Sequence, residues 1–171
     1  MAGQRGSSKL ELLAAIMLIA AFATILLNRL AFYQEMAEKA KVEYTISILK
    51  SALRLRMATM LTEGRSGEYA LLARQNPMDW LEDKPLDSMQ VSNAAGPVSE
   101  KRFAGQWDFN PDRGTLTYWP VRSEHLQQDA SGLKRVRLHV EAVRSEPDDP
   151  RAPVLVVRLR VEPYHWLDAE K

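Results

Sequence analysis

The strongest constraint on the fold is an apolar run from Leu12 to Leu27, in which Thr24 carries the only polar side-chain oxygen. A membrane-spanning helix needs about 20 residues. The stretch from Leu10 to Phe32 reaches that length if the guanidinium of Arg29 extends to the membrane surface. The sequence therefore predicts one membrane-spanning helix, and its large apolar side chains are Leu12, Leu13, Ile16, Leu18, Ile19, Phe22, Ile25, Leu26 and Leu27.

The rest of the chain has the composition of a water-soluble domain. Its 171 residues contain no second run of this kind, which excludes a multi-spanning transporter. The net charge is +1 and the charges are spread without long blocks, so a nucleic-acid partner is not expected. The absence of cysteine excludes disulfides, thiol nucleophiles and thiolate zinc sites.

The residues that flank the apolar run indicate how it is used. A secretory signal peptide would end in a small-residue cleavage site, but residues 28–35 contain none. Arg5 and Lys9 precede the run, which places the amino terminus in the cytoplasm. Gly6 lies before the run, and Glu11 is the fifth residue after Gly6. This arrangement resembles the type IV pilin-like signal, in which a basic leader ends in Gly and the mature chain carries Glu at its fifth position.

The resemblance implies a structural subunit of a type IV pilus-like filament or of a type II secretion filament. Residues 1–6 would be a leader, cut after Gly6 by a prepilin peptidase, and Ser7 would become the new amino terminus, which is methylated in this family. Residues 7–32 would be the membrane and assembly half of a helix, and residues 33–171 a periplasmic pilin-like domain. Glu11 would pair with the amine of a neighbouring subunit, because a carboxylate in an apolar bundle needs a partner. The implied partners are other pilin or pseudopilin subunits, an inner-membrane assembly platform and membrane lipid.

The sequence departs from the family pattern in ways that indicate a minor pilin or pseudopilin. Ser7 stands where the family usually has Phe, residues 8–10 replace the usual Thr-Leu-Ile, and no proline occurs before Pro77. The alternative is a single-pass inner-membrane scaffold protein that forms no filament, with Glu11 incidental. An enzyme is not expected, and neither a metal nor another cofactor, because His125, His139 and His165 are isolated in the sequence.

The apolar run continues without a break into a second helical pattern. No glycine or proline occurs from Arg29 to Thr62, and good helix formers dominate this stretch. Apolar residues recur in steps of three and four, which predicts a stripe along one helix face: Val42, Ile46, Leu49, Leu53, Met57 and Met60. We expect this helix to end near Glu63, with Gly64 as its cap. The stripe suits a coiled coil or a sheet, and its short extent favours a sheet.

The middle of the chain predicts short elements. A second helix is expected from Glu68 to Gln75, ended by Asn76 and Pro77. Trp80 is interpreted as a core residue rather than a binding platform. Residues 92–101 are predicted to form a loop.

The carboxy-terminal part, from about 105 to 163, has the period of β-strands. Strands are expected at residues 106–109, 115–121, 133–143 and 153–162, with a polar loop at 144–152. Alternation of apolar and charged residues predicts an antiparallel sheet with one polar face. The fold class is therefore α+β, with a long amino-terminal helix, half in the membrane, packed on a sheet of about four strands, as in pilins.

Two charged groups are candidate binding features. Arg135, Arg137, Arg158 and Arg160 form a basic ladder interleaved with Glu141 and Glu162. A solvated polar face is the favoured interpretation, and a docking surface for an acidic partner or DNA is the alternative. Calcium could be attracted by Asp129 with Asp148 and Asp149, although a solvated turn is favoured for the two adjacent aspartates.

Overall fold

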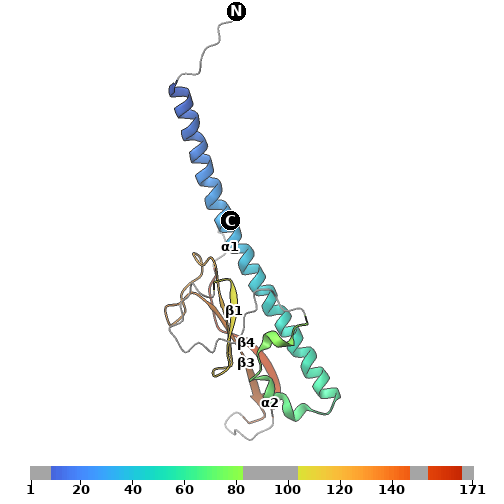
Figure 1. The fold of residues 1–171 in the computed structure, drawn as a ribbon. Coiled ribbons are helices and arrows are strands. Elements are labelled where there is room, and N and C mark those ends of the chain that lie inside the picture. Colours follow the sequence, from blue (N-terminus) through green and yellow to red (C-terminus); the bar gives the residue numbers. More distant parts are fainter. Residues whose placement is uncertain (1–8, 83–103, 147–153, 167–171) are drawn as a thin grey trace, which may run out of the picture. The chain divides into compact units, whose positions relative to one another are not determined.

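The computed structural model describes residues 9–82, 104–146 and 154–166. The chain divides into two compact units, Met1–Ala37 and Glu38–Lys171, and the long helix α1 contributes to both (Figure 1). Gly6, Ser7, the predicted loop at 92–101 and the pair Asp148 and Asp149 lie outside the described residues.

Helix α1 is one continuous helix from Lys9 to Thr62, as the absence of helix breakers predicts. Its end is a Schellman motif in which Gly64 has a left-handed φ of 71°. The Gly64 N–H donates to the Leu61 carbonyl at 3.1 Å, and the Arg65 N–H donates to the Met60 carbonyl at 2.8 Å. These bonds satisfy carbonyls that a helix end leaves without a partner, and they confirm the predicted cap.

The predicted apolar stripe of α1 is buried in the second unit. Five of its six residues are less than 9% exposed: Val42, Ile46, Leu49, Leu53 and Met60. Met57 is the exception, since it is only half-buried. Its backbone carbonyl nevertheless accepts a hydrogen bond from the Tyr69 hydroxyl at 3.1 Å, which ties the helix to the segment that follows it.

The segment after α1 is more broken than the sequence predicts. It contains a 3₁₀ turn η1 (Ser66–Glu68), a helix α2 (Tyr69–Leu72) and a second 3₁₀ turn η2 (Pro77–Trp80). The prediction of a helix as far as Gln75 is wrong, because the N–H groups of residues 73–75 donate three residues back rather than four. Asn76 then caps η2 through its side-chain oxygen, which accepts from the Met78 N–H.

The sheet contains four antiparallel strands in the order β1-β2-β3-β4. They are β1 (Gln106–Asn110), β2 (Thr115–Trp119), β3 (Val136–Arg144) and β4 (Val154–Val161). Strand β3 begins three residues later than expected, because Asp129 and Leu133 close a turn in which the Asp129 N–H donates to the Leu133 carbonyl at 2.8 Å. The four predicted strands and their antiparallel pairing are confirmed.

One face of the sheet forms the core of the second unit with the α1 stripe. Burial alternates along β1 and the first part of β3, as expected when one face is covered, whereas in β2 Thr117 and Trp119 are buried as well. The buried residues of the covered face are Trp107, Phe109, Leu116, Tyr118, Val136, Leu138, Val140, Val157 and Leu159. The part of α1 that belongs to this unit runs along the sheet (Figure 1). The α+β class predicted from the sequence is confirmed. The α1 stripe is buried within the second unit, as expected for packing on a sheet.

Candidate functional site

The first unit exposes the apolar side chains of α1. By length and composition the helix is long and apolar enough to cross a membrane. The large apolar residues predicted for the membrane are exposed by between 53% and 71% of their surface, and they are Leu12, Leu13, Ile16, Leu18, Ile19, Phe22, Ile25, Leu26 and Leu27. An exposed apolar surface of this extent marks a site of contact with a membrane or with another protein.

The backbone and the one polar side chain of this run are compatible with an apolar medium. An α-helix bonds its peptide groups internally, which is the condition for crossing hydrocarbon. The Thr24 hydroxyl donates to the Ala20 carbonyl at 2.8 Å, so it too has a partner within the helix.

Glu11 lies in the first turn of α1, immediately before the apolar run. Its side chain is exposed, and a carboxylate at this end of a helix is favoured by the helix dipole. The structure therefore places Glu11 on the same exposed helix as the predicted membrane residues. The cleavage predicted at Gly6 and the new amino terminus at Ser7 stay predictions.

A second carboxylate on α1, which sequence reasoning missed, fixes the helix to the sheet. Glu38 accepts three hydrogen bonds, from the Tyr118 hydroxyl at 2.8 Å, the Val121 N–H at 2.7 Å and the Arg122 N–H at 3.1 Å. All three donors lie at the end of β2 or just after it. Bonds to an ionised acceptor are stronger than neutral ones, so Glu38 holds the start of the globular unit's helix against this strand end.

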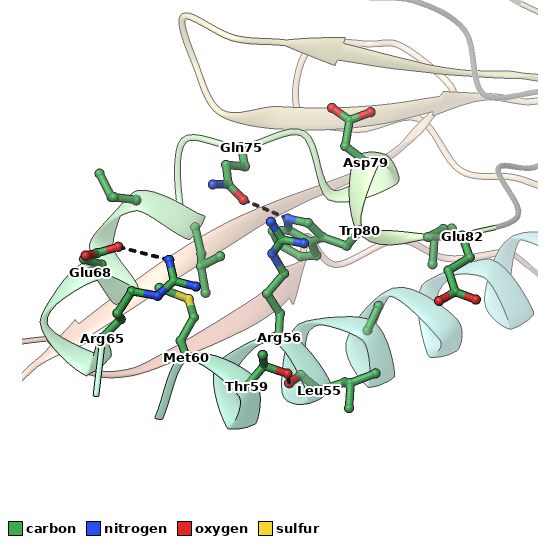
Figure 2. A pocket seen from close by; sticks show the side chains of 14 residues that line it. Leu55, Arg56, Thr59, Met60, Arg65, Glu68, Gln75, Asp79, Trp80 and Glu82 are labelled. Atoms are coloured by element: carbon green, nitrogen blue, oxygen red, sulfur yellow. Dashed lines mark hydrogen bonds and ion pairs between the residues drawn. The ribbon is translucent and has the colours of Figure 1, made fainter. Parts of the chain in front are cut away.

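A groove opens on the second unit between the end of α1 and the segment from Arg65 to Glu82. Its volume is about 750 Å³. Leu55 and Leu71 line it with more than half of their surface exposed. Trp80 borders it with its Nε1–H donating to the Gln75 side-chain oxygen at 3.1 Å (Figure 2). The interpretation of Trp80 as a core residue is wrong: it is half-buried, and Pro77 and Met78 fill the core beside it.

The charged residues of this groove are of both signs. Arg65 pairs with Glu63 and with Glu68, the latter at 3.5 Å. Arg56 rises from α1 toward Trp80, and Asp79 and Glu82 lie at the other margin (Figure 2). Tryptophan and arginine, which both line this groove, are residue types enriched where proteins contact one another.

The predicted basic ladder is largely neutralised on the polar face of the sheet. Glu141 pairs with Arg158 at 2.9 Å and with Arg160 at 3.5 Å, and Arg137 pairs with Glu162 at 2.6 Å. The hydrogen bond from Arg158 outweighs the effect of desolvation and lowers the pKa of Glu141. This arrangement favours the interpretation of a solvated polar face over a docking surface for DNA.

Asp129 organises the remaining end of the ladder. One carboxylate oxygen accepts from the N–H groups of Ser131 at 2.8 Å and Leu133 at 3.1 Å. The other accepts from Arg135 at 2.7 Å, and that guanidinium lies 5.4 Å from the centre of the Trp119 ring. Desolvation alone would raise the pKa of Asp129, but the hydrogen bonds from Arg135 and the two N–H groups outweigh it and lower the pKa. Asp129 therefore stabilises its own turn, while the calcium candidate also involves Asp148 and Asp149, which lie outside the described residues.

The three histidines lie on separate segments, with His125 in the connection before β3, His139 within β3 and His165 after β4. His139 faces the polar side of the sheet, opposite Arg160. Comparison of the chain with protein-family models, with curated proteins and with solved structures gives no match.

Glu38→Ala is expected to lower the free energy of unfolding by about 2 kcal/mol, because three donors lose an ionised acceptor. Tyr118→Phe, which removes one of the three bonds, should cost about 1 kcal/mol. Thermal unfolding of the full chain in detergent, followed by near-UV circular dichroism, measures both. Glu43→Ala removes an exposed glutamate from the same helix and should change little. Equal stability of Glu38→Ala and the wild-type chain would contradict this role.

Asp129→Asn is expected to destabilise the second unit by about 1–2 kcal/mol at pH 7, because it removes a charged acceptor. The folded pKa of Asp129 lies below its ordinary value of 3.8, so its contribution is complete above about pH 5. The contribution disappears as the pH falls through the lowered value, and the gap between wild type and variant should close there. Unfolding measured from pH 7 to pH 2 tests this. The exposed turn residue Asp112, changed to Asn, is the control, and a gap independent of pH would refute the role of the carboxylate charge.

Proposed function

We propose that this protein is a membrane-anchored structural subunit of a type IV pilin-like filament, as a minor pilin or pseudopilin. The observation that carries the proposal is helix α1, which is exposed and apolar after Glu11 and becomes a buried stripe in an α+β unit after Glu38. The first part of α1 would thus anchor the chain in a membrane, and its second part packs on the apolar face of the sheet. The resemblance of the Gly6 and Glu11 arrangement to a prepilin signal supports the same role.

In this proposal the chain is a substrate and a building block rather than a catalyst. A prepilin peptidase cuts after Gly6 on the cytoplasmic side, and the globular unit lies in the periplasm. The exposed apolar face of α1 first lies in the inner membrane and later packs among the helices of other subunits. Glu11 then meets the amine of Ser7 in a neighbouring subunit, because a carboxylate buried among apolar helices must be neutralised.

The alternative is a single-pass scaffold protein of the inner membrane, and the exposed apolar helix supports it equally. The groove beside Trp80, which offers residue types that contact proteins, favours some protein partner for the globular unit in either case. The two functions differ in what happens at Gly6 and Glu11.

The first test is the mass of the mature chain. In cells that contain a prepilin peptidase we expect the membrane-bound protein to lack residues 1–6 and to begin at Ser7, with one added methyl group. Gly6→Leu should block the cut, because a large side chain replaces the residue before the scissile bond, whereas Gly3→Leu should not. Recovery of the intact amino terminus from such cells would support the scaffold.

The second test changes Glu11 to Gln. The variant should remain in the membrane fraction, since its apolar run is unchanged, but its recovery with sheared filaments should fall at least about tenfold. An uncharged side chain cannot neutralise the amine of its neighbour. Glu43→Gln, on an exposed face of the same helix, is the matched control. Unchanged co-assembly of the Glu11 variant would exclude the pairing.

A further inference from the structure

The exposed part of α1 carries a groove at the end of its apolar run. The groove has a volume of about 570 Å³, and its lining residues are Ala23, Leu26, Leu27, Arg29, Leu30 and Tyr33. Two of these residues, Arg29 and Tyr33, have polar groups, and Leu30 lies between them in the sequence. The lining includes one cation and no carboxylate. The surface that faces the groove is almost wholly apolar, and Arg29 is the one charged residue among those that line it.

The two lining residues with polar groups are related by the spacing of a helix. Arg29 and Tyr33 are four residues apart, which places both side chains on one helix face. The ring of Phe32 contacts the ring of Tyr33 edge to face, with centroids 5.8 Å apart. Tyr33 is 64% exposed, so its hydroxyl and the guanidinium of Arg29 are both available as donors to a ligand outside the helix.

We propose that this groove binds an anionic phospholipid, with its phosphate at Arg29 and Tyr33 and an acyl chain along Ala23, Leu26 and Leu30. The inference rests on the proposed function only in that α1 must lie in a bilayer. Guanidinium and phosphate form strong charge-assisted hydrogen bonds, and the phenol adds a neutral donor. An arginine at the edge of hydrocarbon needs such a partner, because its charge is costly there.

The length of the groove fits one leaflet of a bilayer. The ten-residue step from Ala23 to Tyr33 covers about 15 Å at a rise of ~1.5 Å per residue. A bilayer with its headgroup regions is about 40–45 Å thick, so one leaflet, headgroup included, is deep enough to hold the whole groove. Along the helix, the apolar residues Ala23, Leu26 and Leu27 come before the cation Arg29. In a phospholipid, the acyl chain likewise leads to the charged phosphate. These two matches favour a lipid over a helix of a second copy.

The test uses the full chain in vesicles of phosphatidylcholine that contain a minor fraction of phosphatidylglycerol. Spin-labelled phosphatidylglycerol and spin-labelled phosphatidylcholine report, by electron paramagnetic resonance, how strongly each lipid is immobilised at the protein. An arginine near the membrane surface contributes about 1 kcal/mol toward an anionic lipid, which corresponds to about a fivefold preference. We expect that preference in the wild-type chain at low salt.

Arg29→Gln should reduce the preference to about unity, and Tyr33→Phe should reduce it by about half. Arg54→Gln removes an exposed arginine from the globular part of the same helix and should leave it unchanged. Equal losses in the Arg29 and Arg54 variants would overturn the proposal in favour of diffuse attraction by the whole protein. A loss of self-association in Arg29→Gln, with lipid preference intact, would show that a second copy occupies the groove.

Flotation of the vesicles separates this inference from the proposed function. A chain that floats with vesicles but shows no lipid preference refutes the lipid site and leaves the membrane anchor intact. A chain that does not float refutes both. Cleavage at Gly6 and co-assembly through Glu11 are read independently, and we expect both to be unchanged in Arg29→Gln.

Discussion

The second unit depends on the burial of one helical stripe against one face of a sheet. Neither surface is stable alone in water: the stripe from Val42 to Met60 would expose five large apolar side chains, and the sheet would expose those of all four strands. Full burial of a side chain of this size stabilises by about 1.5–3 kcal/mol relative to exposure. The remaining elements, including α2 and the connection before β3, are arranged around this contact.

Apolar burial is non-directional, so it does not by itself decide where the helix sits along the sheet. Glu38 fixes the position of the helix along the sheet, because its carboxylate accepts hydrogen bonds from the Tyr118 hydroxyl and from two N–H groups just after β2. Asp129 does the same for the polar face, where it bonds two N–H groups of its own turn and Arg135. In both places one ionised carboxylate collects several donors and thereby fixes the end of a strand.

Periodic features of the sequence were sufficient to predict α1, its stripe, its glycine cap and the four strands, because each follows from spacing within a few residues. The features that were missed depend on partners far away in the chain. Glu38 reads as one more charged residue of a helix until Tyr118, 80 residues later, is placed beside it. Trp80 reads as a core residue because its size favours burial, yet Pro77 and Met78 occupy that position instead. Helix α2 is short because its last turns follow a 3₁₀ pattern that no spacing indicates.

The two parts of α1 present apolar residues to different surroundings. Between Val42 and Met60 the stripe is covered by the chain's own sheet, and its flanks are charged. Between Leu12 and Leu27 apolar residues occur on every side of the helix, and more than half of the surface of each large one stays exposed. A helix that is apolar all round requires a surrounding apolar medium, which a single covering face cannot supply. That requirement is met by a bilayer and equally by a bundle of like helices, so the exposed segment by itself is compatible with either surrounding.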